Sequence, residues 1–328
     1  MRTERLSTMI NPLVLFLMGL MIGILTGFFG IGGGLLMTPA LNILGLPMVH
    51  AIGTGFPAIA GNTLIGVIRH RKRGNVDLKL GIAMGVFCIM GVELGKSLVL
   101  HLEKLSLAGM YVRAAYIILL TVISIIMFRD YYSWKTRHNE APGETIGSKA
   151  NTHTMPRHIH RIELPPMISL SRSGVGSISL WVIIISGFLI GLLSGFMGIG
   201  GGLIGLPLMI YVMGVPTIIA VGTSLVIVFL TSCYGTASYA LAGNVEWTAA
   251  LMVLAGSAIG VHFGVYATDG VTEMKIKILF ALLLFLVAVS VFLKQMDIVT
   301  VSSYLVVGSA CVLSLAIVLP LRKKLRAR

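Results

Sequence analysis

Charged residues are scarce in this sequence. Asp, Glu, Lys and Arg make up 11% of the 328 residues, whereas soluble proteins carry about 25%. Hydrophobic residues reach 56% of the chain. A water-soluble enzyme is therefore excluded, and the expected surroundings of the chain are a lipid bilayer.

Acidic residues are the scarcest charged class. The chain has 12 Asp and Glu but 25 Lys and Arg, which gives a formal net charge of +13. In a soluble protein such an excess would suggest a nucleic-acid partner. Here the basic residues stand between long apolar runs, as is typical of the cytoplasmic loops of membrane proteins. We therefore expect no nucleic-acid partner.

Cysteine is nearly absent. Cys88, Cys233 and Cys311 each stand in an apolar run without a Cys-x-x-Cys spacing, so neither a disulfide framework nor a zinc site is indicated. Half of the histidines fall in one polar segment: His138, His153, His158 and His160. Without carboxylates or thiolates at ligand spacing, solvated loop histidines are favoured over a metal site. No metal and no cofactor are expected.

Long apolar runs dominate what the sequence does contain. A helix needs about 20 largely apolar residues to cross the hydrocarbon of a bilayer. The runs that reach this length are residues 11–44, 49–68, 78–100, 108–128, 178–212, 216–242, 247–266, 275–293 and 301–319. We therefore predict an all-α polytopic membrane protein with eight or nine transmembrane helices.

Two of these runs, 11–44 and 178–212, have about 34 residues each and are too long for one straight span. Each carries a glycine cluster at its centre. The pattern predicts a helix, an unwound segment and a short half-helix, because irregular backbone at membrane depth is tolerated where it is buried or lines a cavity. We count each broken run as a single crossing.

The second half of the sequence repeats motifs of the first. Gly-Phe-x-Gly-Ile-Gly-Gly-Gly occupies residues 27–34 and returns at 195–202, an offset of 168. After one inserted residue, further pairs match at an offset of 169: Gly53-Thr54 with Gly222-Thr223, and Gly-Asn-Val-Asp at 74–77 with Gly-Asn-Val-Glu at 243–246. These matches indicate an internal duplication.

The duplication divides the chain into four parts. We predict transmembrane repeats at residues 1–130 and 178–295, a basic cytoplasmic linker at 131–177, and an additional helix with a basic tail at 296–328.

The distribution of Lys and Arg gives the expected orientation. A cytoplasmic N-terminus places the basic cluster at 69–79 and the seven Lys and Arg of 129–172 inside. The same count leaves the basic tail at 322–328 outside, so either one crossing is miscounted or the last run does not cross. Since four crossings separate the copies, the repeats are expected to be parallel.

The doubled Gly-Phe-x-Gly-Ile-Gly-Gly-Gly-Leu, the proline five residues beyond it, the Val-Gly-Thr-Ser at 221–224 and the Gly-Asn-Val-Asp/Glu motif resemble the TauE/SafE family of sulfite exporters. The resemblance covers about residues 18–293. It implies an inner-membrane transporter, not an enzyme, whose substrate is a sulfur-containing anion such as sulfite, thiosulfate or an organosulfonate. No ATP-binding motif is present, which favours a secondary transporter. A homo-oligomer is left open.

The two glycine triplets are the predicted substrate-binding elements: Gly32, Gly33 and Gly34 in the first half, and Gly200, Gly201 and Gly202 in the second. At the start of a half-helix the first amides lack intrahelical partners, and the dipole adds roughly half a positive charge. Such an end attracts an anion. The alternative is close helix packing, the role that we assign to Gly91-x-x-x-Gly95 and Gly260-x-x-x-Gly264.

Polar side chains in the spans are expected to face the same cavity: Thr38, Thr54, Asn62, Thr63, Thr223, Ser224 and Thr231. Thr54 and Thr223 recur at corresponding positions of the repeat. Hydroxyl and amide groups in spans also bond neighbouring helices, and this is the alternative for each residue.

Glu93 and His262 are ionisable residues inside spans, at corresponding positions of the two halves. Ionisable groups in spans are costly and often functional, so this pair is a candidate proton relay. The alternative is a local ion pair of Glu93 with Lys96, with His262 hydrogen-bonded in the bundle. A channel-like anion uniporter on the same scaffold would need neither group.

Overall fold

A computed structural model describes residues 11–140, 165–169, 177–267, 271 and 273–325. The side chains of the four linker histidines lie outside the described part. The helices of the first half are α2 (Pro12–Phe29), α3 (Gly34–Ile43), α4 (Met48–Lys72), α5 (Leu78–Lys104) and α6 (Ala108–Glu140). Two short antiparallel strands follow, β1 (Met167–Ser169) and β2 (Ser177–Ser179).

The second half has the same order of helices and one more. It contains α7 (Leu180–Met197), α8 (Gly202–Pro207) with the π-helical turn η2 (Leu208–Val212), α9 (Thr217–Leu241), α10 (Trp247–Ala267), α11 (Glu273–Gln295) and α12 (Val299–Leu325).

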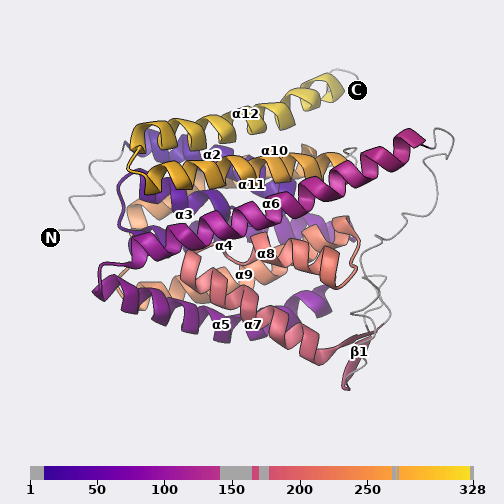
Figure 1. Cartoon of the computed structure of the whole chain (residues 1–328), viewed down its shortest axis with the longest axis horizontal. Helices are drawn as coiled ribbons and strands as arrows, with labels where there is room; N and C mark the ends of the chain where they lie inside the picture. The colour runs from indigo at the N-terminus through magenta and orange to yellow at the C-terminus, as the bar shows by residue number, and fades with distance from the viewer. Residues whose placement is uncertain (1–10, 141–164, 170–176, 268–270, 272, 326–328) are drawn as a thin grey trace.

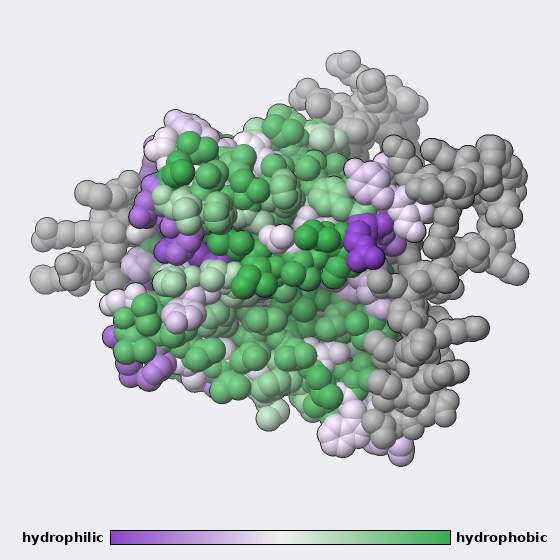
Figure 2. Space-filling view, in the orientation of Figure 1, coloured by the Kyte–Doolittle hydropathy of each residue, from purple (hydrophilic) through white to green (hydrophobic). Residues whose placement is uncertain are grey.

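The helices form one bundle (Figure 1). Nine of the described helices are long and apolar enough to cross a membrane, which confirms the prediction of an all-α polytopic membrane protein. The face shown in Figure 2 is apolar along its middle and polar towards its two ends, as expected for a molecule that spans a bilayer.

Local signals in the sequence fix where helices begin and end. Asn11 caps α2, since its Oδ1 accepts a hydrogen bond from the Leu13 amide at 2.9 Å. Asp77 caps α5 in the same way, accepting from the Leu80 amide at 3.1 Å. Gly30 ends α2 in the left-handed conformation, with φ 70°.

Each glycine-broken run turns back on itself. A Cβ built on Gly33 would lie 2.5 Å from Thr26 Oγ1 and 2.9 Å from Ile22 Cγ2, so the chain has reversed along α2. A Cβ on Gly201 would likewise meet Ile190 of α7 at 2.7 Å. The prediction that each run crosses once is therefore wrong. Hydropathy reports the length of an apolar run but not its direction, and left-handed glycines let the chain reverse.

Close glycine contacts give the directions of neighbouring helices. The glycines of α2 meet residues of increasing number on α10: Gly19 with Val253, Gly23 with Ser257 and Gly27 with Val261. α2 and α10 are therefore parallel. α4 and α9 are antiparallel, because Gly66 lies against Leu225 and Gly235 against Phe56.

α4 and α9 stand at the same place in the helix order of their halves. Because they are antiparallel, the two halves run in opposite directions. The expected parallel arrangement is wrong, since it depended on counting each hairpin as one crossing.

The Gly-x-x-x-Gly pairs of α5 and α10 hold the hairpins in place. A Cβ on Gly91 or Gly95 would collide with the backbone of α7, and one on Gly260 or Gly264 with the backbone of α2. The packing role predicted for these glycines is confirmed. Each hairpin helix is thus packed against the opposite half of the chain.

The bundle has two ends. We call one of them the linker end; it holds the α4–α5 turn, the C-terminal ends of α6 and α12, and the start of α7. The N-terminal end holds the starts of α2, α4 and α6. α6 and α11 are antiparallel, since Ser124 Oγ donates to the Ala281 carbonyl at 3.1 Å and Lys277 Nζ to Asp130 Oδ2 at 3.0 Å. The start of α2 and the end of α12 lie on opposite sides of the bundle (Figure 1).

Candidate functional site

The glycine segments 30–34 and 198–202 meet inside the bundle, and we name this place the glycine crossing. A Cβ on Gly34 would lie 2.5 Å from the carbonyl oxygen of Ile199, and one on Gly202 would lie 2.6 Å from that of Ile31. Every residue of both segments is buried. The structure thus brings the two predicted glycine triplets together, at the starts of α3 and α8.

The backbone of the crossing requires glycine. Six residues have positive φ angles: Gly30 (70°), Gly32 (76°), Gly33 (85°), Gly198 (74°), Gly200 (71°) and Gly201 (91°). Side chains with a Cβ rarely adopt this region. No side chain caps the N-terminus of α3 or α8, so the first amides of the two half-helices lack both intrahelical and side-chain partners.

Hydroxyl groups bind the carbonyl oxygens of the crossing. The bonds are Ser224 Oγ to Gly30 at 2.8 Å, Thr231 Oγ1 to Gly200 at 2.7 Å and Thr38 Oγ1 to Gly198 at 3.2 Å. The predicted site residue Ser224 therefore lies at the crossing, with its proton donated to the backbone. Because these carbonyls are occupied, the amides are the backbone groups that remain for a ligand.

Two buried hydroxyls beside the crossing lack a partner. Thr26 Oγ1 and Ser194 Oγ are fully buried, and neither has a hydrogen-bond partner within the described residues. Thr26 Oγ1 lies 2.5 Å from the Cβ position of Gly33. The sequence-based prediction missed both residues, although a hydroxyl residue directly precedes each copy of the glycine motif. An unpaired buried hydroxyl costs about 1–3 kcal/mol.

Asn62 is a third unpartnered polar side chain. It is fully buried, and neither its Nδ2 nor its Oδ1 has a partner in the described chain. Its turn of α4 lies against the crossing, since the Cβ position of Gly32 is 3.3 Å from Ile59 Cγ2 and 3.2 Å from Thr63 Cγ2. The structure therefore buries this predicted site residue, with its amide unpartnered, on a turn of α4 that borders the crossing.

Thr54 and Thr223 form hydrogen bonds between the two halves of the chain. Thr54 Oγ1 accepts a hydrogen bond from the Glu246 amide at 2.9 Å, and Thr223 Oγ1 accepts from the Asp77 amide at 3.0 Å. Each threonine thus holds the Gly-Asn-Val-Asp/Glu turn of the opposite half. The structure gives both predicted site residues a bond between the halves, which is the alternative weighed for them above.

Glu93 and His262 are not brought together. Glu93 Oε2 accepts from Ser238 at 2.6 Å and Tyr234 at 3.0 Å, and Lys96 Nζ lies 3.2 Å from Oε1. His262 is exposed, and its Nδ1 lies 3.0 Å from a carbonyl of its own helix. The structure therefore has the ion pair of the alternative interpretation. Within the described ranges, no group of three or more His, Cys, Asp or Glu could hold a metal ion.

Comparison with known proteins adds an independent finding. A family model described as "Sulfite exporter TauE/SafE" matches residues 15–291. A "Probable membrane transporter protein" of Xylella fastidiosa is 27% identical over 249 residues, which cover 75% of this chain and 80% of the relative. The "Probable membrane transporter protein YdhB" of Bacillus subtilis is 26% identical over 275 residues, 82% of this chain and 94% of the relative. No solved structure matches the chain.

Proposed function

The chain belongs to the TauE/SafE family of sulfite exporters, and from this premise we propose that it is a secondary transporter that binds a small sulfur-containing anion at the glycine crossing. Sulfite, thiosulfate and organosulfonates are the candidate substrates. The observation that carries the proposal is the convergence of two uncapped half-helix starts with the unpartnered side chains of Thr26, Asn62 and Ser194.

The chemistry of the crossing suits an oxyanion. The amides at the start of a helix carry partial positive charge and attract anions. Thr26, Ser194 and the Asn62 amide add donors, and each gains a partner when an anion oxygen accepts from it. No Lys or Arg stands in segments 30–34 or 198–202. Binding through neutral donors is weaker than binding through a buried cation, so the substrate can be released.

The opposite directions of the two halves suit transport. A site at the interface of two inverted halves is approached through equivalent elements from either side of the membrane, as in other transporters built this way. Alternating access would follow from movement of one half against the other.

We infer that the linker end faces the cytoplasm. It carries the basic cluster of residues 69–79 and the last turns of α12, where Arg322, Lys323 and Lys324 stand. Because the hairpins return to the end they came from, the basic clusters expected on opposite sides now lie on the same side. Cytoplasmic loops are enriched in Lys and Arg. The N-terminus then lies outside, opposite to the sequence-based expectation.

A channel-like anion uniporter is the second candidate. It is favoured by one observation: Glu93 is engaged by Lys96, Ser238 and Tyr234, and His262 is exposed. Neither titratable group touches the crossing, so a proton need not accompany the anion. Uptake that follows the anion gradient alone, without response to an imposed pH gradient, would favour the uniporter.

Uptake into proteoliposomes tests the proposal. Sulfite, thiosulfate and a small organosulfonate, each labelled, are offered to the wild type and to Thr26→Val and Asn62→Leu. Hydrogen bonds to charged groups contribute about 1.5–3 kcal/mol, so each variant should lose roughly 10- to 100-fold in uptake. Thermal stability should stay the same or rise, because an unpaired buried polar group is removed.

Thr63→Val is the matched control. Thr63 also lies against the crossing, but its hydroxyl donates to the Ile59 carbonyl at 2.7 Å within α4. It should retain near wild-type uptake. Wild-type uptake in Thr26→Val and Asn62→Leu would place the substrate elsewhere, and absence of uptake for all three anions would refute the substrate class.

A further inference from the structure

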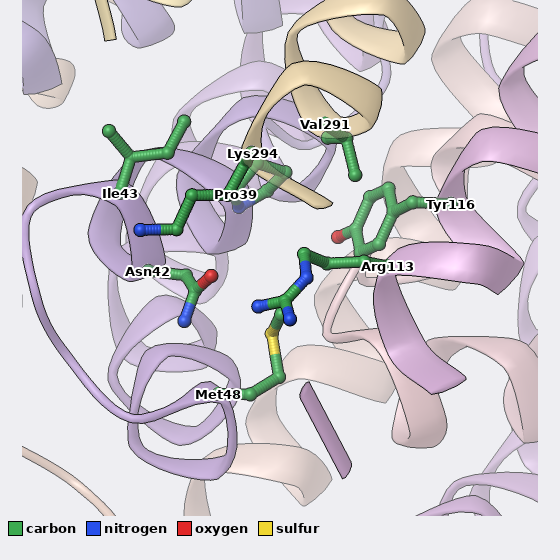
Figure 3. A pocket seen from close by; sticks show the side chains of 8 residues that line it. All are labelled: Pro39, Asn42, Ile43, Met48, Arg113, Tyr116, Val291 and Lys294. Carbon is green, nitrogen blue, oxygen red and sulfur yellow. The ribbon is translucent and has the colours of Figure 1, made fainter. Parts of the chain in front are cut away.

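A pocket at the N-terminal end of the bundle lies between α3, α6 and α11 (Figure 3). It is a small pocket, partly open to the surroundings, with about 10 Å³ of enclosed space, so a ligand larger than a water molecule would lie at its mouth. Its inner surface is apolar, the side chains of Arg113, Lys294 and Asn42 stand around it, and the ring of Tyr116 forms part of its wall. Arg113 and Lys294 are half-buried.

The pocket carries two cations without a carboxylate in contact. Arg113 Nε donates to the neutral Gln295 Oε1 at 2.6 Å. Among the described residues, no ion pair within 4.0 Å includes Arg113 or Lys294. Asp297, exposed in the turn after α11, acts on both cations only from longer range. Two like charges held together in partial burial attract an anion.

At the other end of α6 and α11, a carboxylate neutralises the cation of α11. There Asp130 of α6 lies 3.0 Å from Lys277 Nζ of α11, and Tyr211 donates to the same carboxylate oxygen at 3.2 Å. The Lys277 side chain is 2% exposed. At the linker end the cation on α11 thus has its anion within the protein.

Tyr116 of α6 and Phe280 of α11 give a register in which the two ends can be compared. Tyr116 of α6 reaches the Met197 carbonyl beside the crossing at 2.9 Å, and Phe280 of α11 packs on Phe29 on the other side at 5.3 Å between ring centres. Counted from these two aromatic residues, the corresponding pairs are Arg113 with Lys277 and Asp130 with Lys294. Lys294 therefore stands where the other half has the carboxylate.

We propose that the pocket binds a small oxyanion in place of this missing carboxylate, as a recruitment site for the transported anion. Arg113 would bind two oxygens through its planar guanidinium, with Lys294 Nζ and the Asn42 amide as further donors. This inference rests on the proposed function for the identity of the anion. In the orientation inferred above, the pocket faces the outside.

Tyr116 connects the pocket to the crossing. Its ring lines the pocket, while its hydroxyl donates to the Met197 carbonyl at 2.9 Å and lies 3.5 Å from that of Gly34. A bound anion is therefore separated from the start of α3 by one side chain. Recruitment beside the path raises the local concentration of substrate, which lowers KM without changing the maximal rate.

The decisive variant is Lys294→Asp, because it builds the ion pair of the linker end into the pocket. We expect the KM for sulfite uptake to rise at least tenfold, with the maximal rate within twofold of wild type. Arg113→Gln should raise KM in the same way. Lys104→Asp is the control, since it makes the same charge change at an exposed site on the same end of the bundle. It should leave KM within twofold.

Two further arms make the test specific. An anionic lipid headgroup offers the same oxyanion chemistry, so uptake is measured in phosphatidylcholine vesicles with and without phosphatidylglycerol. A KM difference between wild type and Lys294→Asp that persists without anionic lipid supports recruitment of the free anion. A difference seen only with phosphatidylglycerol, or none at all, overturns the proposal.

Calorimetric titration of the detergent-solubilised full chain with sulfite separates the two proposals. Sulfite heat that is reduced in Lys294→Asp but unchanged in Lys104→Asp supports the pocket even if no anion is transported, in which case only the proposed function fails. Unchanged heat and KM in Lys294→Asp refute the pocket, while the Asn62 and Thr26 variants still test the crossing. Should Lys294→Asp give too little folded protein, Lys294→Gln takes its place with the same readouts.

Discussion

Gly33 shows how much of the crossing depends on single residues. Its φ of 85° and the 2.5 Å between its Cβ position and Thr26 Oγ1 leave room for hydrogen alone. Any other residue is strained by its backbone conformation and also displaces an unpartnered hydroxyl. The glycine therefore serves the geometry of the turn and the space beside it together.

Replacing Gly33 by alanine should lower stability by about 1–2 kcal/mol, the cost of a left-handed residue with a Cβ. Uptake should fall by more than the loss of folded protein accounts for, because the new methyl group would occupy the proposed site. Gly205→Ala is the control, since its nearest neighbour would be Ile190 Cδ1 at 3.7 Å. Thermal unfolding and proteoliposome uptake measure both effects, and equal losses in the two variants would speak against a special role of Gly33.

Glu93→Gln should leave the response of uptake to a pH gradient unchanged. The Glu93 side chain is 44% exposed and paired with Lys96, so the loss of stability should be under about 1 kcal/mol. A second change, Lys96→Met, should restore any lost yield. If Glu93→Gln instead abolishes gradient-driven uptake while exchange at equal pH persists, the proton relay is reinstated.

Residue types alone could point to some of these positions and not to others. Asn62 and the glycine triplets were predicted, because an amide in a span and glycines in an over-long run are visible in the sequence. Thr26 and Ser194 were not, since a hydroxyl in a helix normally bonds its own backbone. Only the structure shows that these two do not.

At the scale of elements, the glycine-rich faces of helices determine which helices pack with their backbones in contact. Gly187, Gly191 and Gly195 of α7 lie against the backbone of α5. Such close approach lets hairpin helices pack where any larger side chain would hold them apart. The hairpins consequently depend on shape, because hydrophobicity does not distinguish one apolar neighbour from another inside a membrane.

Gly191→Ala should separate α5 from α7. The new Cβ would lie 2.7 Å from Cys88 Cα, and such overpacking costs about 1–3 kcal/mol. Gly308→Ala on α12, where a Cβ meets nothing within 4 Å, should be neutral. Thermal unfolding in detergent compares the two, and a neutral Gly191→Ala would mean that the helices can move apart at little cost.

The helices themselves were predictable, but their directions were not. Apolar length marked the starts of the unbroken spans to within a few residues, as for α10, predicted at 247–266 and found at Trp247–Ala267, whereas α6, predicted at 108–128, continues to Glu140. The reversal after Phe29 depends on tertiary contacts of Gly33 with Ile22 and Thr26, which hydropathy does not contain. One undetected reversal in each half was enough to invert the expected relation of the repeats.

For the whole molecule, the distribution of charge becomes consistent once the hairpins are recognised. The basic turn after α4 and the basic end of α12 lie on one side, so the tail that contradicted the sequence-based count now agrees with the rest. The proposed orientation thus rests on the fold and the charges together, and neither suggests it alone.

Reporter fusions check this orientation. A fusion after Arg137 and one at the C-terminus should both read as cytoplasmic, and one at the N-terminus as external. Enzymatic reporters active on only one side of the membrane give the answer in cells. A cytoplasmic N-terminus together with a cytoplasmic fusion after Arg137 would require an odd number of additional crossings and would contradict the hairpins.

The contact of Gly34 with Ile199 and of Gly202 with Ile31 has a mechanical consequence. Each half contributes one loop to a joint that lies inside the bundle, and neither loop can be withdrawn without disturbing the other. A rocking motion about this joint would displace the helix ends most and the joint itself least. A ligand held there would remain nearly stationary while the walls around it exchange, so the point that binds the anion would also be the fulcrum of the movement that carries it across.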